Sequence, residues 1–168
     1  MEFKVNSGKL TEALVLIARE WPDITPFFVA KVLYFADRDH LRRFGRPVTG
    51  DRYIAMKHGP VPSHAYDIMK NPSALHGLTV SADGRYARLR ATREPDVNVF
   101  SRSDLEALRD SISYCQAHQF DEVSKQTHRH KAWRNADEND VMQPIDFLDG
   151  VDEKIVEEAH AFAAYGVL

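Results

Sequence analysis

The stretch from Thr25 to Gly45 constrains the fold most, because it carries the signals for both ends of one long helix. Thr25 is a residue type that caps helix N-termini, and Pro26 follows at the first helical position, where a missing N–H group costs no hydrogen bond. Apolar residues then recur at helical spacing, and Gly45 can adopt the left-handed conformation that often follows the last helical turn. The sequence therefore predicts an amphipathic helix over this stretch.

Similar signals predict five further helices, over residues 8–20, 62–70, 103–115, 121–129 and from 152 onward. Asn6 or Ser7 can cap the first of them. The order Ser103-Asp104-Leu105-Glu106 is typical of a capping box, with Ser103 as the N-cap. We expect Cys115 to end the apolar stripe of that helix, and Phe162 to be buried by the last one.

Two segments are typical of β-structure. Tyr53–Lys57 is expected to be a short strand, and the sequence from His58 to Pro62 is expected to be a turn. Alternation from Leu78 to Ala91, interrupted by Asp83-Gly84, indicates a hairpin with a two-residue turn. The predicted fold class is α+β: a mainly helical single domain over residues 1–168, with a small antiparallel β-sheet made of the hairpin plus a short strand.

Composition bounds the function. The chain has 168 residues, of which 43% are hydrophobic and one is cysteine, so it can build a core without a disulfide. No apolar stretch has the length of a signal peptide or a membrane span, so we expect a cytoplasmic protein with no membrane partner. The net charge of -3 argues against a general nucleic-acid binder. Residues 31–57 are nevertheless net basic, and residues 137–160 are strongly acidic. These two segments can either form two separate charged surfaces or pack against each other.

Three side-chain groups could carry chemistry, and each has a simpler explanation. His128 and His130 have a spacing that could share a metal in extended backbone, but a helix would point them apart, so we expect no metal site. Tyr34, Asp37 and His40 share a helix face, and we favour a hydrogen-bond network over an active site.

Cys115 could be a nucleophile beside His118, but its place in an apolar stripe favours a core residue. The glycines form neither a P-loop nor a dinucleotide-binding motif. The sequence therefore supplies no complete active site, and we expect no enzyme activity.

One long motif resembles a known family. The run from Val32 to Asp37, the stretch Gly45–Gly50, and the stretch His58–Pro62 together resemble the Panacea domain, the family of SocA-like antitoxins. Ser124, His128 and Trp133 resemble a second, weaker motif of the same family. The motif residues that we interpret as structural are Tyr34, Asp37, Gly45, Pro47, Gly50, Tyr53, His58, Gly59 and Pro60.

The resemblance implies an antitoxin that binds and neutralises a cognate protein toxin. The SocA-like branch further implies a proteolytic adaptor that delivers its toxin to ClpX and the ClpXP protease. It implies no cofactor and no catalytic residue. The resemblance does not indicate which surface of the chain contacts the toxin.

Charged segments are the candidates for contacting that partner. The acidic candidates are Asp149, Asp152 and Glu153, and the basic ones are Arg42, Arg43 and Arg46. The uncharged tail over residues 163–168 could tether the chain to a protease component. An alternative function is a DNA-binding regulator of its own operon that uses the basic stretch from Arg42 to Arg52.

Overall fold

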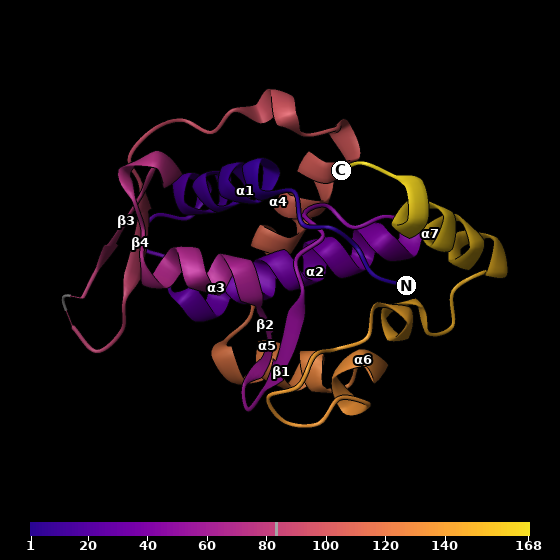
Figure 1. Cartoon of the computed structure of the whole chain (residues 1–168). Coiled ribbons are helices and arrows are strands. Elements are labelled where there is room, and N and C mark those ends of the chain that lie inside the picture. Colours follow the sequence, from indigo (N-terminus) through magenta and orange to yellow (C-terminus); the bar gives the residue numbers. More distant parts are fainter. Residues whose placement is uncertain (83) are drawn as a thin grey trace.

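The computed structural model describes residues 1–82 and 84–168, which form a mainly helical α+β fold (Figure 1). This fold class is the one that the sequence predicted. The helices are α1 (Ser7–Glu20), α2 (Pro26–Phe44), α3 (Ser63–Lys70), α4 (Arg102–Ala117), α5 (Phe120–His128), α6 (Lys131–Arg134) and α7 (Glu153–Tyr165). Three short 3₁₀ turns are η1 (Ala74–His76), η2 (Val97–Val99) and η3 (Pro144–Leu148). The strands are β1 (Tyr53–Met56), β2 (Gly59–Pro62), β3 (Leu78–Ser81) and β4 (Arg88–Ala91).

Helix α2 runs through the centre of the molecule and contacts α1, α3, α4, α7 and β2 (Figure 1). Its predicted ends are confirmed: Thr25 is the N-cap residue, Pro26 opens the helix, and Gly45 ends it in the left-handed conformation with φ of 65°. The Gly45 N–H donates to the Leu41 carbonyl oxygen at 2.9 Å, which satisfies one of the last free carbonyls. The Thr25 side chain makes no capping bond, so Pro26 carries the start signal here.

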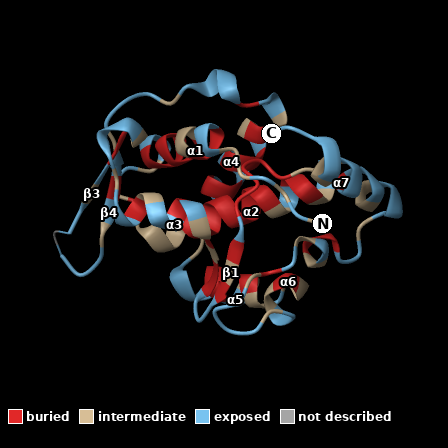
Figure 2. Cartoon of the chain, in the orientation of Figure 1, coloured by how far each residue is buried: buried red, intermediate tan, exposed pale blue. Residues whose placement is uncertain are grey.

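Burial is concentrated where α1, α2 and α4 meet (Figure 2). Helix α1 begins after Asn6, whose side chain accepts the Lys9 N–H, and it buries an almost continuous apolar run from Leu10 to Ala18. Each fully buried leucine or isoleucine contributes about 2 kcal/mol relative to exposure. One hydrophobic cluster extends from Leu10 to Ala159, so the first and last helices share a core.

The prediction of one sheet is wrong in its details. The structure has two separate two-stranded antiparallel sheets, β1–β2 and β3–β4. Residues 59–62, predicted as a turn, form strand β2, which pairs Tyr53 with Pro62 and Met56 with Gly59. Proline is tolerated there because β2 has β1 on one side only, and a proline on a free edge leaves no pairing bond unmade. The segment near Met142 bonds to the other edge of β1, where Met142 N–H donates to Tyr53 O at 2.9 Å.

The β3–β4 hairpin projects from the body of the molecule (Figure 1). Its pairing begins at Leu78 with Ala91 and ends at Ser81 with Arg88, so the predicted strand residues from Arg85 to 87 lie outside the ladder. The predicted turn at Asp83-Gly84 includes Asp83, which lies outside the described residues. A bridge between Leu89 and Ile24 ties the hairpin to the segment between α1 and α2.

The start of α4 differs from its prediction. Ser101, and not Ser103, is the N-cap, and its capping box closes on Asp104 instead of Glu106. Ser103 is free to bond elsewhere, as the site geometry below explains. Helix α7 starts close to its predicted position, with Asp152 as the N-cap, but Phe162 is only half-buried. None of the helices in residues 1–82 and 84–168 combines the length and apolar character that crossing a lipid bilayer requires.

Candidate functional site

The carboxylate of Asp37 is a buried hydrogen-bond acceptor that holds the loop after α2. Its Oδ1 accepts the N–H groups of Val48 and Thr49 at 2.9 and 2.7 Å, and its Oδ2 accepts the Thr49 and Tyr53 hydroxyls at 2.6 and 2.8 Å. Burial raises the pKa of Asp37 to about 6, although the hydrogen bonds from Thr49 and Tyr53 act in the opposite direction. Asp37 therefore fixes where the chain turns back toward β1.

The other two members of the predicted Tyr34–Asp37–His40 set bond elsewhere. The hydroxyl of Tyr34 lies 2.7 Å from Nδ1 of His130 at the start of α6. Nδ1 of His40 bonds to the Arg46 carbonyl oxygen at 2.8 Å, and its Nε2 lies 2.9 Å from Ser103 Oγ. The three side chains thus do not bond to each other, and together they tie α2 to the loop that follows it, to β1, to α4 and to the start of α6. This arrangement supports the network that we favoured over an active site.

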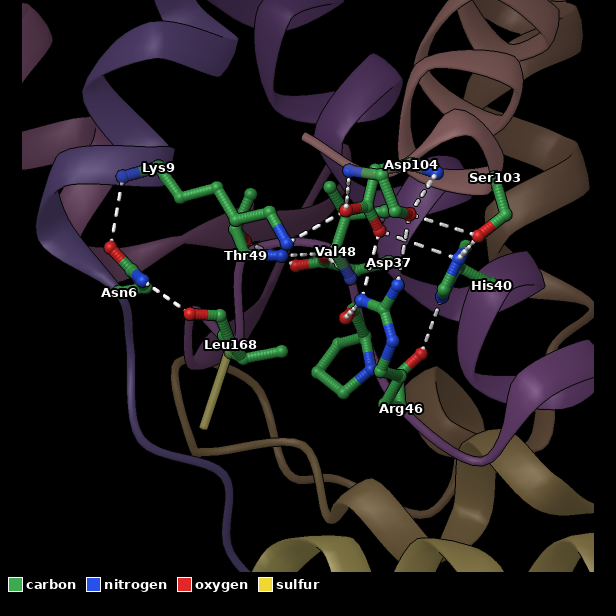
Figure 3. A network of polar contacts seen from close by, with 12 residues as sticks. Asn6, Lys9, Asp37, His40, Arg46, Val48, Thr49, Ser103, Asp104 and Leu168 are labelled. Carbon is green, nitrogen blue, oxygen red and sulfur yellow. Dashed lines mark hydrogen bonds and ion pairs between the residues drawn. The ribbon is translucent and has the colours of Figure 1, made fainter. Parts of the chain in front are cut away.

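A second buried network joins α1, α2 and α4 around Asp104 (Figure 3). Lys9 Nζ lies 2.8 Å from Asp104 Oδ2, and Arg46 Nη1 lies 2.9 Å from Oδ1. Burial opposes ionisation of Asp104, but hydrogen bonds from Lys9 and the Ser101 backbone outweigh it and hold its pKa below the usual value. Arg46, which we predicted to contact a partner, is therefore engaged inside the molecule.

The basic and acidic segments pack against each other at the C-terminal end of α2. The Arg42 guanidinium donates to the carbonyl oxygens of Phe147 and Asp149 at 2.7 and 2.8 Å. The Asp149 carboxylate lies 3.2 Å from Lys131 Nζ. Arg43 stays exposed beside the Phe44 ring. The charge pattern allowed the basic and acidic segments either to form separate surfaces or to pack together. At Arg42 and Asp149 they pack together.

Helix α7 carries several exposed acidic side chains. Asp152 caps it by accepting the Lys154 N–H at 2.9 Å, so this residue has a structural role. Glu153, Glu157 and Glu158 are exposed, and none of them forms an ion pair within the described residues. Of the three acidic residues predicted to contact a partner, Glu153 is thus exposed on this helix together with Glu157 and Glu158.

A cleft of about 490 Å³ lies between the C-terminal half of α2 and α4. Its charged lining residues are Arg38, Arg42, Arg43, Asp39 and Asp110. His130 also lines the cleft, and burial, followed by the charges of Arg38 and Arg42, lowers its pKa to about 4. The cleft therefore places a neutral histidine beside charges of both signs.

The remaining sequence candidates lie apart from each other. Within the described residues, no three His, Cys, Asp or Glu side chains gather as a metal-binding group. His128 stacks on Trp133 with ring centroids 3.8 Å apart, whereas His130 faces Tyr34. Cys115 is fully buried, and this burial raises the pKa of its thiol to about 12, which is far from that of a nucleophile.

The glycines and prolines of the motif hold close approaches. A Cβ on Gly59, where φ is 99°, would overlap the Thr127 hydroxyl, and one on Gly50, where φ is 74°, would lie 2.7 Å from Lys4 O. Pro47 and Pro60 are buried in the loop after α2 and in β2. His58 is exposed in the β1–β2 turn. Most of these residues therefore pack inside the molecule, and His58 is the exception.

Four buried charged residues were missed from the sequence: Lys9, Lys31, Asp51 and Asp104. Asp51 accepts the N–H groups of His64 and Ala65 at 3.0 and 2.9 Å, and so holds the start of α3. A charged residue inside an otherwise apolar run was the available signal for Lys31, which lies between Ala30 and Val32.

These features define a mainly helical α+β protein whose motif residues chiefly build the fold and whose terminal helix carries exposed carboxylates. The family described as "Antitoxin SocA-like, Panacea domain" matches residues 29–134, from the first turns of α2 to the end of α6. The chain therefore belongs to the SocA-like Panacea family, as the motif predicted. No curated protein and no solved structure matches it.

Proposed function

We propose that this protein is an antitoxin that binds and neutralises a cognate protein toxin, and that it acts by binding without catalysis. Membership of the antitoxin-like family supports the first part. The second part is supported by the polar residues of this helix face, because the motif residues Tyr34 and Asp37 and the nearby His40 each hold an internal contact.

The exposed acidic face of α7 is the observation that carries the choice of surface. Glu153, Glu157 and Glu158 present carboxylates that no described ion pair neutralises, on a helix that projects at the end of α2 (Figure 1). Such a face steers a basic protein toward it and speeds association at low salt. We therefore assign toxin contact to this face.

The test is to co-express the chain with the product of its neighbouring gene, purify the complex and measure association kinetics. The double variant Glu157→Lys/Glu158→Lys should slow association about tenfold at low salt. Asp149 and Asp152 are avoided, because the first pairs with Lys131 and the second caps α7.

The control is Asp67→Lys/Glu138→Lys, which changes the net charge equally at two exposed positions outside α7. This variant should associate within about twofold of the wild type. Equal slowing by both variants would mean that net charge alone matters, and unchanged kinetics of the α7 variant would remove the assigned surface. A neighbouring gene product that is not toxic, or that does not bind, would remove the antitoxin role.

Delivery of the toxin to ClpXP is the finer proposal. The tail after α7 folds back, and the Leu168 carbonyl oxygen accepts a hydrogen bond from Asn6 Nδ2 at 2.6 Å. A tail that serves as a tether must first leave this contact. Reconstituted ClpXP should degrade the toxin faster with the intact antitoxin than with one that lacks residues 166–168. Equal degradation by both would remove the tail as the tether, and no degradation by either would favour simple masking.

Internal hydrogen bonds of the arginines weaken the alternative of a DNA-binding regulator. Arg42 and Arg46 donate to internal acceptors, which leaves Arg43 and Arg52 exposed. Two exposed arginines contact few phosphates, and the affinity of a DNA-binding protein scales with such contacts. A mobility-shift titration at low salt should therefore show no binding to operon DNA.

A further inference from the structure

A second surface hollow lies at the opposite end of α2, between its first turns, the β1–β2 hairpin and α3. Its volume is about 230 Å³, and it is lined by Pro26, Phe27, Ala30, Lys31, Met56, Lys57, His58, Gly59, Val61, Tyr66 and Met69. The distance from Phe27 to Gly45 along α2 is about 27 Å at 1.5 Å per residue, so the hollow is separate from the α7 face. Small-molecule pockets usually measure about 300–1,000 Å³, so this hollow fits one or two side chains better than a whole cofactor.

Large apolar side chains surround the hollow and stay accessible. Met56 is 37% exposed, and Tyr66 and Phe120 are each 41% exposed. Phe120 extends the rim, because its ring lies 4.2 Å from that of Phe27 and 5.2 Å from that of His58. Exposed aromatic and methionine side chains around a concavity are typical of protein-binding surfaces.

The charge of the hollow has one sign. Lys31 and Lys57 line it, Lys70 lies 5.3 Å from the ring of Tyr66 beside it, and no Asp or Glu is among its described lining residues. A segment that enters the hollow therefore meets cations next to an apolar floor. Carboxylates are the partner groups that complement this pattern.

Lys31 adds a buried charge at this place. Its side chain is 1% exposed, and its ammonium group donates to the Pro60 carbonyl oxygen at 2.7 Å and lies 4.8 Å from the Phe27 ring. An ammonium group has three N–H donors, and only this one hydrogen bond is found within the described residues. Burial lowers the pKa of Lys31 to about 7, which agrees with an incompletely compensated charge.

We propose that this hollow is a docking site for a short segment of a partner protein in which an apolar side chain is flanked by Asp or Glu. The apolar side chain enters between Phe27, Tyr66 and Met69, and the carboxylates pair with the exposed Lys57 and Lys70. Strand addition is disfavoured as the binding mode, because Pro60 and Pro62 on the edge strand β2 have no N–H to donate. The site is independent of the α7 face and of the antitoxin role.

The experiment is a selection of a random twelve-residue phage-displayed peptide library on the immobilised full chain. Selected peptides are then synthesised with a fluorescent label and titrated by fluorescence anisotropy. We expect them to share an apolar residue flanked by Asp or Glu. The variants Tyr66→Glu and Lys57→Glu should each weaken their binding about tenfold, because each places a negative charge beside the bound carboxylates.

Matched controls change the same charges elsewhere: Leu75→Glu, at a side chain that is 88% exposed on η1, and Lys154→Glu, at an exposed position on α7. Both controls should bind the peptides like the wild type, as should Glu157→Lys/Glu158→Lys. Circular dichroism checks the fold of each variant. No enrichment, selected peptides without acidic residues, or equal binding to Tyr66→Glu, Lys57→Glu and the wild type would overturn the proposal. No toxin takes part in this assay, so its failure is distinct from failure of the antitoxin proposal.

Discussion

Replacing Asp37 by alanine or by asparagine separates the two tasks of this carboxylate, accepting hydrogen bonds and carrying a charge. Alanine removes all four acceptor contacts. The hydroxyls of Thr49 and Tyr53 can turn toward other acceptors, but the N–H groups of Val48 and Thr49 are fixed by the backbone. Each buried N–H group left without an acceptor costs about 1–3 kcal/mol, so the alanine variant should lose about 4 kcal/mol of unfolding free energy.

Asparagine keeps an oxygen for the two N–H groups, and its amide can donate to the two hydroxyl oxygens. Because burial raises the pKa of Asp37 from 3.8 to about 6, folding favours its protonated form. The stabilisation is complete below the unfolded-state pKa and is lost as the pH rises through the folded-state pKa. It amounts to about 3 kcal/mol in total, of which about 1 kcal/mol falls between pH 5 and pH 7. The wild type should therefore lose its advantage over the asparagine variant as the pH rises.

The assay is urea unfolding at 25 °C, followed by circular dichroism at pH 5 and pH 7, for the wild type and both variants. The difference between wild type and asparagine variant isolates Asp37, because the other titrating groups are common to both proteins. An alanine variant within about 1 kcal/mol of the wild type would refute the assignment of Asp37 as the acceptor that holds the loop. A difference that grows with rising pH would refute the sign of the pKa shift.

Three further predictions concern other buried groups. Gly45→Ala should lower the melting temperature by about 5 °C, because φ of Gly45 is 65° and the new Cβ would lie 2.9 Å from Glu158 Cβ. The control Gly8→Ala, inside α1, should not lower the melting temperature. An equal decrease for both variants would contradict the prediction. Cys115 should react with Ellman's reagent at pH 8 far more slowly in the native protein than in urea, and similar rates would show that it is accessible. The ring of His130 should stay neutral from pH 8 to pH 5 in an NMR titration, because burial lowers its pKa to about 4. The unfolding free energy should therefore fall as the pH drops from about 6.5 toward 4. A titration midpoint of His130 near pH 6.5 would contradict the burial.

Local signals explain which elements could be predicted from the sequence. Asn6, Pro26 and Gly45 act within their own helix ends, so the bounds of α1 and α2 follow from neighbouring residues alone. Strand β2 could not be found this way. Pro60 and Pro62 are typical of turns, and only the place of β2 at a sheet edge, which is set by the fold, makes them acceptable in a strand.

The polar networks depend on contacts between distant segments. Arg46 was interpreted as a surface cation because it belongs to the basic stretch from Arg42 to Arg52, but its partner Asp104 lies on a helix that begins far along the chain. Likewise, Ser103 fits an N-cap by spacing alone, yet its hydroxyl faces His40. The family motif indicated which segment of the sequence is important, and its polar residues were interpreted as structural from the sequence alone. The hydrogen-bond partner of each of these residues could be identified only from the fold.

The ion pair between Lys9 and Asp104 has a practical consequence for dissecting the molecule. The family match begins at residue 29, so Asp104 lies inside it and Lys9 outside. A fragment limited to residues 29–134 would leave a buried carboxylate without its lysine and uncover the face of α2 that α1 protects. Removing one partner of a buried ion pair costs about 3–5 kcal/mol, a large part of the stability of most domains. A fragment that functions on its own must therefore include more of the chain than the residues that the family matches.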